Sequence, residues 1–249
     1  GKYILKRIAL AIVTIWAVAT ITFFLMNLVP GGPFLSEKAI SPAATKALEA
    51  KYGLDKPMAE RYFTYISDAA HGDFGDSLKQ RGRTVMDIVA TKFPVSARLG
   101  GMAVVLALCV GVPLGVLAAY KRGTFIDSLF SVIATCGIAV PGFVICTLLL
   151  YVFGVKLQWL PTLGLKSAQS YIMPVVALAA YPTSYIMRLM RSSMLDVLGQ
   201  DYMRTAKAKG LSQKVSLFKH ALRNAILPVI TYVGPMLAYT LTGSFVTEK

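Results

Sequence analysis

Charged residues are scarce in this 249-residue sequence: Asp, Glu, Lys and Arg make up only 15%, whereas hydrophobic types make up 55%. Five long stretches, about 8–29, 99–120, 128–153, 171–187 and 225–247, contain no charged residue and no histidine. Each is near the ~20 apolar residues that a helix needs to cross ~30 Å of hydrocarbon. The sequence therefore excludes a water-soluble enzyme and predicts an all-α polytopic membrane protein with five visible transmembrane helices.

Catalytic and metal-binding signatures are also missing. The sequence has no phosphate-binding GxxxxGK[ST] loop, no HExxH, no GxSxG and no pair of carboxylates in an apolar setting. His71 and His220 are far apart in the predicted topology, and Cys109, Cys136 and Cys146 fall inside apolar stretches as small packing residues. We expect no catalytic residue, no cofactor and no metal. Because the spans also lack the buried charges of an ion-coupled carrier, energy for uphill transport must enter through another subunit.

Basic residues collect in three regions that the predicted spans place on one side of the membrane. These regions are the N-terminus, the 121–127 turn and the 188–223 segment, whereas 30–98 holds eight of the twelve acidic residues. Lys and Arg in short loops are retained on the cytoplasmic side. The formal charge of +14 is thus explained by membrane topology, not by nucleic acid. We expect a multi-pass protein of the inner membrane, with membrane lipid around it and a cytoplasmic N-terminus.

Three parts follow from this arrangement. Residues 1–29 form the N-terminal cytoplasmic end and first transmembrane helix, 30–98 a small helical extracytoplasmic subdomain, and 99–249 the transmembrane core. In the subdomain, Ser41-Pro42 and Pro57 are typical of helix starts, and Gly53 and His71-Gly72 of helix ends. Five spans would leave Lys249 outside without a tail, so we expect a sixth, returning helix that this sequence does not include.

Glycine and proline pairs mark positions inside the spans where helices pack closely or kink. A small-xxx-small pattern allows two helix backbones to approach, and proline removes a backbone hydrogen bond. Simple packing and a place beside a transport pathway are both open for these positions. The residues are Gly111, Pro113 and Gly115 in the second span, Pro141 and Gly142 in the third, and Gly234 and Pro235 in the fifth.

Residues 199–223 are too polar to span the membrane and too regular for a loose loop. Asp201 can cap a first helix that stops at Gly210, and Ser212 can cap a second one, which predicts a cytoplasmic helix-turn-helix. Its second helix carries an apolar stripe made of Leu211, Val215, Phe218 and Leu222. Three uses of the stripe are open: docking in a partner's groove, lying on the lipid headgroups, or packing on the protein's own helices.

The stretches Arg204-Thr-Ala-Lys-Ala-Lys-Gly210-Leu211 and His220-Ala-Leu-Arg-Asn-Ala-Ile-Leu-Pro228 resemble the cytoplasmic signature of binding-protein-dependent ABC importer permeases. The signature has the form found in the oligopeptide/dipeptide group of these permeases, and the chain most resembles the B-type subunit of that group. Further similarities lie at Leu28-Val-Pro-Gly-Gly-Pro33, Lys51-Tyr-Gly-Leu54, Gly72-Asp-Phe-Gly-Asp-Ser-Leu78 and Phe93-Pro94. The resemblance covers nearly the whole chain.

This resemblance implies a permease subunit without a catalytic site of its own. A second permease would complete the pathway, two cytoplasmic ABC ATPases would supply energy, and an extracytoplasmic binding protein would deliver oligopeptides. The family has six spans. The general importer pattern begins Glu-Ala-Ala where this sequence has Arg204-Thr205-Ala206, so no role is carried over from that glutamate. The residues expected to contact the ATPase are Arg204, Ala206, Gly210, Leu211, Val215, Phe218 and His220.

Other functions fit the sequence as well. The same architecture can carry dipeptides, nickel chelates or glycosides, because nothing in the uncharged spans selects among them. A membrane scaffold or anchor whose 30–98 region binds partners is the alternative outside transport. A secondary carrier is disfavoured because the spans lack charged residues.

Overall fold

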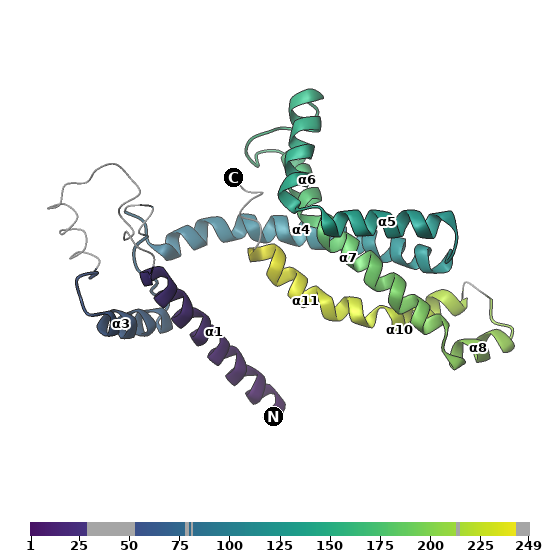
Figure 1. The fold of residues 1–249 in the computed structure, drawn as a ribbon, viewed down its shortest axis with the longest axis horizontal. Helices are drawn as coiled ribbons and strands as arrows, with labels where there is room; N and C mark the ends of the chain where they lie inside the picture. Colours follow the sequence, from purple (N-terminus) through teal and green to yellow (C-terminus); the bar gives the residue numbers. More distant parts are fainter. Residues whose placement is uncertain (29–52, 78–79, 81, 213–214, 243–249) are drawn as a thin grey trace. The chain divides into compact units, whose positions relative to one another are not determined.

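The computed structural model describes residues 1–28, 53–77, 80, 82–212 and 215–242. These residues form helices, and the only strand-like pairing among them is an isolated antiparallel bridge between Asp76 and Thr84. They divide into two compact units, Gly1–Lys92 and Phe93–Lys249. Figure 1 shows the chain as a ribbon.

The first unit contains α1 (Lys2–Leu28), α3 (Met58–Ala70) and the start of α4 (Val85–Tyr120). No residue of α1 is buried, as expected for a helix whose environment is lipid or another subunit. The phenol of Tyr62 on α3 lies 2.7 Å from the hydroxyl of Thr20 on α1, and its ring contacts Phe23 and Phe24. Helix α1 is therefore tied to α3 by one hydrogen bond and an aromatic cluster.

Helix α3 matches the sequence prediction at both ends. Pro57 occupies the position before its first residue, His71 the position after its last, and Gly72 has a positive φ of 83°. The helix predicted to begin at Ser41-Pro42 falls outside the described residues. Helix α4 begins at Val85, inside the range 30–98 predicted for the subdomain.

The second unit is built around α7 (Ile172–Leu198), which contacts helices on both sides of it in the sequence. The remaining elements, in chain order, are α5 (Phe125–Ala139), α6 (Gly142–Leu149), the π-helix η1 (Leu150–Lys156), the 3₁₀ turn η2 (Ala168–Tyr171), α8 (Asp201–Ala208), the π-helix η3 (Ser216–Ala221), α10 (Leu222–Ala225) and α11 (Leu227–Thr242). Helix α7 packs against α5, α6, α10 and α11.

The core of the second unit lies along the buried side of α7. Ile186, Met190 and Met194 have relative exposures of 0% and pack with small residues of α4 such as Ala107 and Ala119. Burying a large aliphatic or methionine side chain stabilises a water-soluble protein by about 1.5–3 kcal/mol. In a bilayer this driving force is weak, so close packing carries more of the association between the helices.

Three helices are long and apolar enough to cross a membrane alone: Lys2–Leu28, Val85–Tyr120 and Ala168–Leu198. Two bent pairs bring the total to five if each pair is one span: Phe125–Ala139 with Gly142–Lys156, and Ser216–Ala225 with Leu227–Leu241. The described residues thus hold three to five candidate spans. Five, the number predicted, is the upper limit.

The stretch 128–153 is broken and bent by 101°, next to Pro141-Gly142, where the sequence predicted a break or kink. Val140 and Pro141 adopt extended backbone angles, with ψ of 123° and 138°. Proline has no N–H for the helix and disfavours helical angles at the residue before it, which explains the break. In the last stretch the bend, 45°, lies at Ile226 before α11, whereas α11 runs through Gly234-Pro235 without a break.

Candidate functional site

The helix pair that follows α7 is the main candidate site. Helix α8 begins at Asp201 itself and ends at Ala208; Asp201 is thus the first helical residue and not the cap before the helix. Gly210 follows with a φ of 75°, a left-handed conformation that costs a side-chain-bearing residue about 1–2 kcal/mol. The backbone N–H of Leu211 donates to the carbonyl of Ala206 at 3.3 Å, which closes the helix end in the way a glycine permits.

The second helix of the pair starts as the sequence predicts and then changes its winding. The hydroxyl of Ser212 accepts a hydrogen bond from the N–H of Val215 at 3.4 Å, as an N-cap does. From Ser216 to Ala221 the helix is a π-helix, an arrangement that is rare and frequent at functional sites. The hydroxyl of Ser216 is buried and has no hydrogen-bond partner among the described residues.

One face of this helix pair belongs to the core of the unit. Met203 and Ala221 have relative exposures of 1% and 0% and pack in the same cluster as Met194 at the end of α7. Ala206 is also buried. The amide of Asn224 donates to the phenol oxygen of Tyr202 at 2.9 Å and joins α10 to α8. The pair is therefore fixed to the end of α7 and is not a loose loop.

The opposite face is apolar and exposed. Leu211, Val215 and Phe218 have relative exposures of 38%, 41% and 61%. Leu222, the fourth residue of the predicted stripe, turns toward the core and is half-buried. Three of the four stripe residues thus form one uncovered apolar patch, which we call the docking patch: Leu211, Val215 and Phe218.

The other residues expected to contact the ATPase lie in different environments. Arg204 is exposed, and its Nη1 lies 3.6 Å from Oδ1 of Asp201. His220 is half-buried in the π-helix. Ala206 lies on the core side of the pair. The structure therefore brings Leu211, Val215 and Phe218 to the surface and places Ala206 on the opposite face.

An ion pair that sequence reasoning missed joins α5 to α7. The guanidinium of Arg191 donates through both Nε and Nη2 to the carboxylate of Asp127, with 2.8 Å between Nη2 and Oδ2. The backbone N–H of Gly123 donates to the same Oδ2 at 3.0 Å. Asp127 has a relative exposure of only 5%, so its charge is held by paired donors. The available signal was an acid, Asp127, at the edge of one apolar stretch and two arginines, Arg188 and Arg191, just after the end of another.

Two glycines of α4 bring its backbone close to the backbone of α7. A Cβ atom at Gly111 would lie 2.8 Å from the carbonyl oxygen of Thr183, and one at Gly115 would lie 2.6 Å from that of Met187. Contacts this short leave no room for a side chain. Pro113, Gly142, Gly234 and Pro235 are exposed and take no part in this contact.

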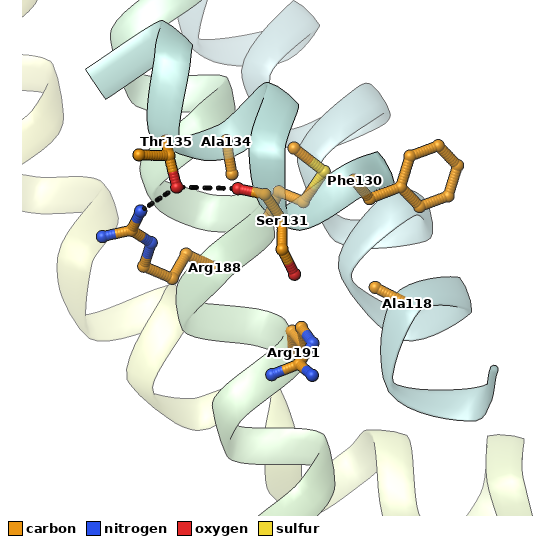
Figure 2. A pocket seen from close by; sticks show the side chains of 8 residues that line it. Ala118, Phe130, Ser131, Ala134, Thr135, Arg188 and Arg191 are labelled. Atoms are coloured by element: carbon orange, nitrogen blue, oxygen red, sulfur yellow. Dashed lines mark hydrogen bonds between the residues drawn. The ribbon is translucent and has the colours of Figure 1, made fainter. Parts of the chain in front are cut away.

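A pocket of about 240 Å³ opens between α4, α5 and α7. Figure 2 shows Arg188 and Arg191 on one side of it and Ser131 and Thr135 on the other. Arg188 donates from Nη2 to the hydroxyl of Thr135 at 2.8 Å, and that hydroxyl donates to the carbonyl of Ser131. Within the described residues the pocket thus combines a paired arginine, Arg191, with an arginine that has no carboxylate beside it.

The apolar helices and the helix pair fixed to α7 define an integral membrane protein with several crossing helices. Residues 111–249 match the description "Binding-protein-dependent transport system inner membrane component", and residues 1–100 match the N-terminal part of such membrane components. The chain belongs to this family and is a permease component of a binding-protein-dependent ABC importer of the inner membrane.

Similar proteins are found in several bacteria. The chain is 45% identical to the oligopeptide transport system permease protein OppB of Salmonella typhimurium, over 99% of this chain and 81% of that protein. It is also 45% identical to the dipeptide transport system permease protein DppB of Bacillus subtilis, over 100% and 81%. OppB of Escherichia coli is 43% identical over 99% and 81%.

Proposed function

We propose that this subunit forms half of a peptide pathway and receives the force for transport through the helix pair at 201–222. Two relatives named as oligopeptide permeases and one named as a dipeptide permease support a peptide substrate. The partners are a second permease subunit, two cytoplasmic ABC ATPases and an extracytoplasmic peptide-binding protein. The basic residues around 121–127 and 188–223 favour a cytoplasmic position for this helix pair and for the N-terminus.

The docking patch is the observation that carries the proposal. Leu211, Val215 and Phe218 are exposed while the other side of the same helix pair is already buried. Packing on the protein's own helices is thus taken by the opposite face, which argues against internal packing as the use of the stripe. Insertion of an amphipathic helix into a partner's groove buries such a patch and yields binding free energy.

The connection to α7 supports transmission of force. Met203 and Ala221, behind the docking patch, pack with Met194 of α7. A partner that holds the patch differently in two nucleotide states therefore acts on α7 through a close-packed contact. Differential contacts of this kind shift the populations of inward-facing and outward-facing arrangements.

A reconstituted system tests the proposal. The subunit is assembled in proteoliposomes with its candidate second permease, ATPases and binding protein, and ATP hydrolysis and peptide uptake are both measured. Phe218→Asp places a charge in the docking patch, and we expect peptide uptake to fall at least tenfold while the subunit still inserts. Phe125→Asp is the matched control, because Phe125 is another exposed phenylalanine, with a relative exposure of 79%, at the start of α5.

Three results would contradict the proposal. The first is peptide uptake that is equal in Phe218→Asp and in the parent. The second is an assembly with no peptide-dependent ATP hydrolysis at all, as a scaffold would give. The third is uptake driven by an ion gradient without ATP, which would identify a secondary carrier.

Dipeptides are the second candidate substrate, because the relative from Bacillus subtilis is named as a dipeptide permease. Competition between a labelled pentapeptide and unlabelled dipeptides in the same proteoliposomes separates the two. Displacement by dipeptides at equal concentration would favour dipeptide uptake.

A further inference from the structure

The exposed face of α7 carries a row of polar side chains. Tyr181, Tyr185, Arg188 and Ser192 follow one another at spacings of four, three and four residues, which places them on one face of a helix. Tyr181, Arg188 and Ser192 are exposed and Tyr185 is half-buried. We call these four residues the polar row. Buried residues such as Ile186 and Met190 occupy the other side of the helix.

Helix α11 extends this surface with two further tyrosines. The ring of Tyr232 lies 4.4 Å from that of Tyr185, and the ring of Tyr239 lies 6.1 Å from that of Tyr181, between centroids. Tyr181 and Tyr185 also stack on each other at 6.4 Å. Four phenol rings from two helices therefore form one continuous wall, with Arg188 one turn further along α7.

The depth of Tyr181 argues against contact with lipid. Within the uncharged stretch 171–187, Tyr181 lies roughly 15 Å from one end and 9 Å from the other at 1.5 Å per residue. Tyrosines that anchor a helix at the headgroups lie near its ends. In the part of the chain that the structure describes, the hydroxyls of Tyr181, Tyr185 and Tyr232 have no hydrogen-bond partner. Hydrocarbon supplies none, so exposure to lipid would be unfavourable.

Close helix packing is also a poor explanation. Membrane helices pack through small residues, and α7 uses its other side for this purpose, where Gly111 and Gly115 of α4 approach its backbone. The polar row consists of two tyrosines, an arginine and a serine. Helix α11 contacts it through the rings of Tyr232 and Tyr239, yet Tyr181, Arg188 and Ser192 stay exposed. Polar side chains inside a membrane protein typically face a water-filled cavity.

We propose that the polar row, together with Tyr232 and Tyr239, lines the pathway along which the peptide crosses the membrane. A peptide carries an N–H and a C=O at every residue, whatever its sequence, and phenol hydroxyls both donate and accept hydrogen bonds. The aromatic faces accommodate side chains of different size. Such a wall suits a substrate class defined by its backbone.

Arg188 adds recognition of an anionic group at the end of this wall. Arg191 is neutralised by Asp127, whereas no carboxylate lies beside Arg188 among the described residues, and Ser131 and Thr135 add hydroxyls to the pocket (Figure 2). Guanidinium groups bind carboxylate and phosphate in the same bidentate way. Since this inference rests on the proposed peptide transport, the ligand is the C-terminal carboxylate of the peptide. A phosphate of a lipid headgroup shares its chemistry and is separated from it by the test below.

Cysteine accessibility tests the wall. In the assembled transporter, with Cys109, Cys136 and Cys146 replaced by serine, single cysteines are introduced as Tyr181→Cys or Ser192→Cys. The matched control is Val176→Cys, an exposed apolar position on another face of the same helix. A membrane-impermeant thiol reagent should modify the two polar-row cysteines at least tenfold faster than the control, and peptide should slow this reaction. Equal rates, or protection by the second permease without any effect of peptide, would overturn the proposal.

Peptide chemistry tests Arg188. We expect Arg188→Gln to reduce uptake of a free-acid peptide about tenfold, as the loss of one charge-assisted interaction allows, and to leave uptake of the same peptide with a C-terminal amide unchanged. Arg188→Lys should retain part of the preference. An equal loss for both peptides, or a loss that depends on the content of anionic lipid, would exclude the peptide carboxylate. If the cysteine-free parent transports peptide and these effects are absent, only this inference fails; if the parent transports none, the proposed function fails.

Discussion

The contact between α4 and α7 gives a prediction whose size follows from the structure. In Gly115→Ala the new methyl group would lie 2.6 Å from the carbonyl oxygen of Met187 and 2.7 Å from Cβ of Met190. Neither atom is the end of a flexible side chain, so the helices must separate. Forcing extra atoms into a close-packed contact typically costs about 1–3 kcal/mol.

Gly101 of the same helix is the matched control, because a Cβ atom there meets nothing within 4 Å. Alanine in place of glycine inside a helix is favourable by about 0.8–1 kcal/mol, so Gly101→Ala should be neutral or slightly stabilising. Both variants gain the same helix propensity, so they should differ by the packing cost alone, about 2 kcal/mol in free energy of unfolding. This corresponds to roughly 4–8 °C in Tm for a chain of this size.

The assay is heat-induced unfolding of the purified protein in detergent, followed by the loss of the monodisperse peak in size-exclusion chromatography. Gly115→Ala should unfold at a lower temperature than the parent and Gly101→Ala should not. If Gly115→Ala is as stable as Gly101→Ala, the two helices are not in backbone contact at this position and the reasoning is wrong.

Three further predictions follow from contacts within the two units. Asp127→Asn removes the carboxylate from Arg191 and should lower the free energy of unfolding by about 2–4 kcal/mol, since the acid is buried. The control Glu60→Gln breaks an exposed pair with Lys56 and should change the free energy of unfolding by less than about 1 kcal/mol. Both changes are read as shifts in Tm. Gly210→Val places a branched side chain at a φ of 75° and should fray the end of α8, visible as faster proteolysis between α8 and η3, whereas unchanged proteolysis would mean that the turn tolerates the strain. Tyr62→Phe removes the hydrogen bond to Thr20 but keeps the ring contacts, so the free energy of unfolding should fall by no more than about 1 kcal/mol, with a correspondingly small fall in Tm. A fall in Tm as large as that of Tyr62→Ala would show that the hydroxyl, not the ring, joins the two helices.

Local patterns predicted much of this molecule because their physical causes are local. Length and the absence of charge located the apolar stretches, and the conformational freedom of Gly210 and the capping ability of Ser212 located the turn between α8 and η3. The spacing of apolar residues at 211, 215 and 218, which fits one face of a helix, predicted the docking patch, since helical periodicity depends on neighbouring residues alone.

What the sequence could not supply are the relations between distant residues. Pro141-Gly142 was identified as a break or kink, but the 101° bend also depends on how α6 packs against α7. The pairing of Asp127 with Arg191 spans 64 positions. The wall of tyrosines needs Tyr232 and Tyr239 of α11 beside the polar row, and their distance in the sequence hid this contact. Burial of Leu222 instead of exposure likewise follows from the core cluster around Met194 and not from periodicity.

The spacing of the two glycines in α4 limits how α7 can slide. Gly111 and Gly115 are one helical turn apart, and so are Ile186 and Met190, the side chains nearest to them. A small axial displacement would press these side chains against the α4 backbone, whereas a shift by four residues, about 6 Å, would bring one of them opposite a glycine again. This spacing therefore favours axial positions of α7 that lie whole turns apart, and positions between them are unfavourable.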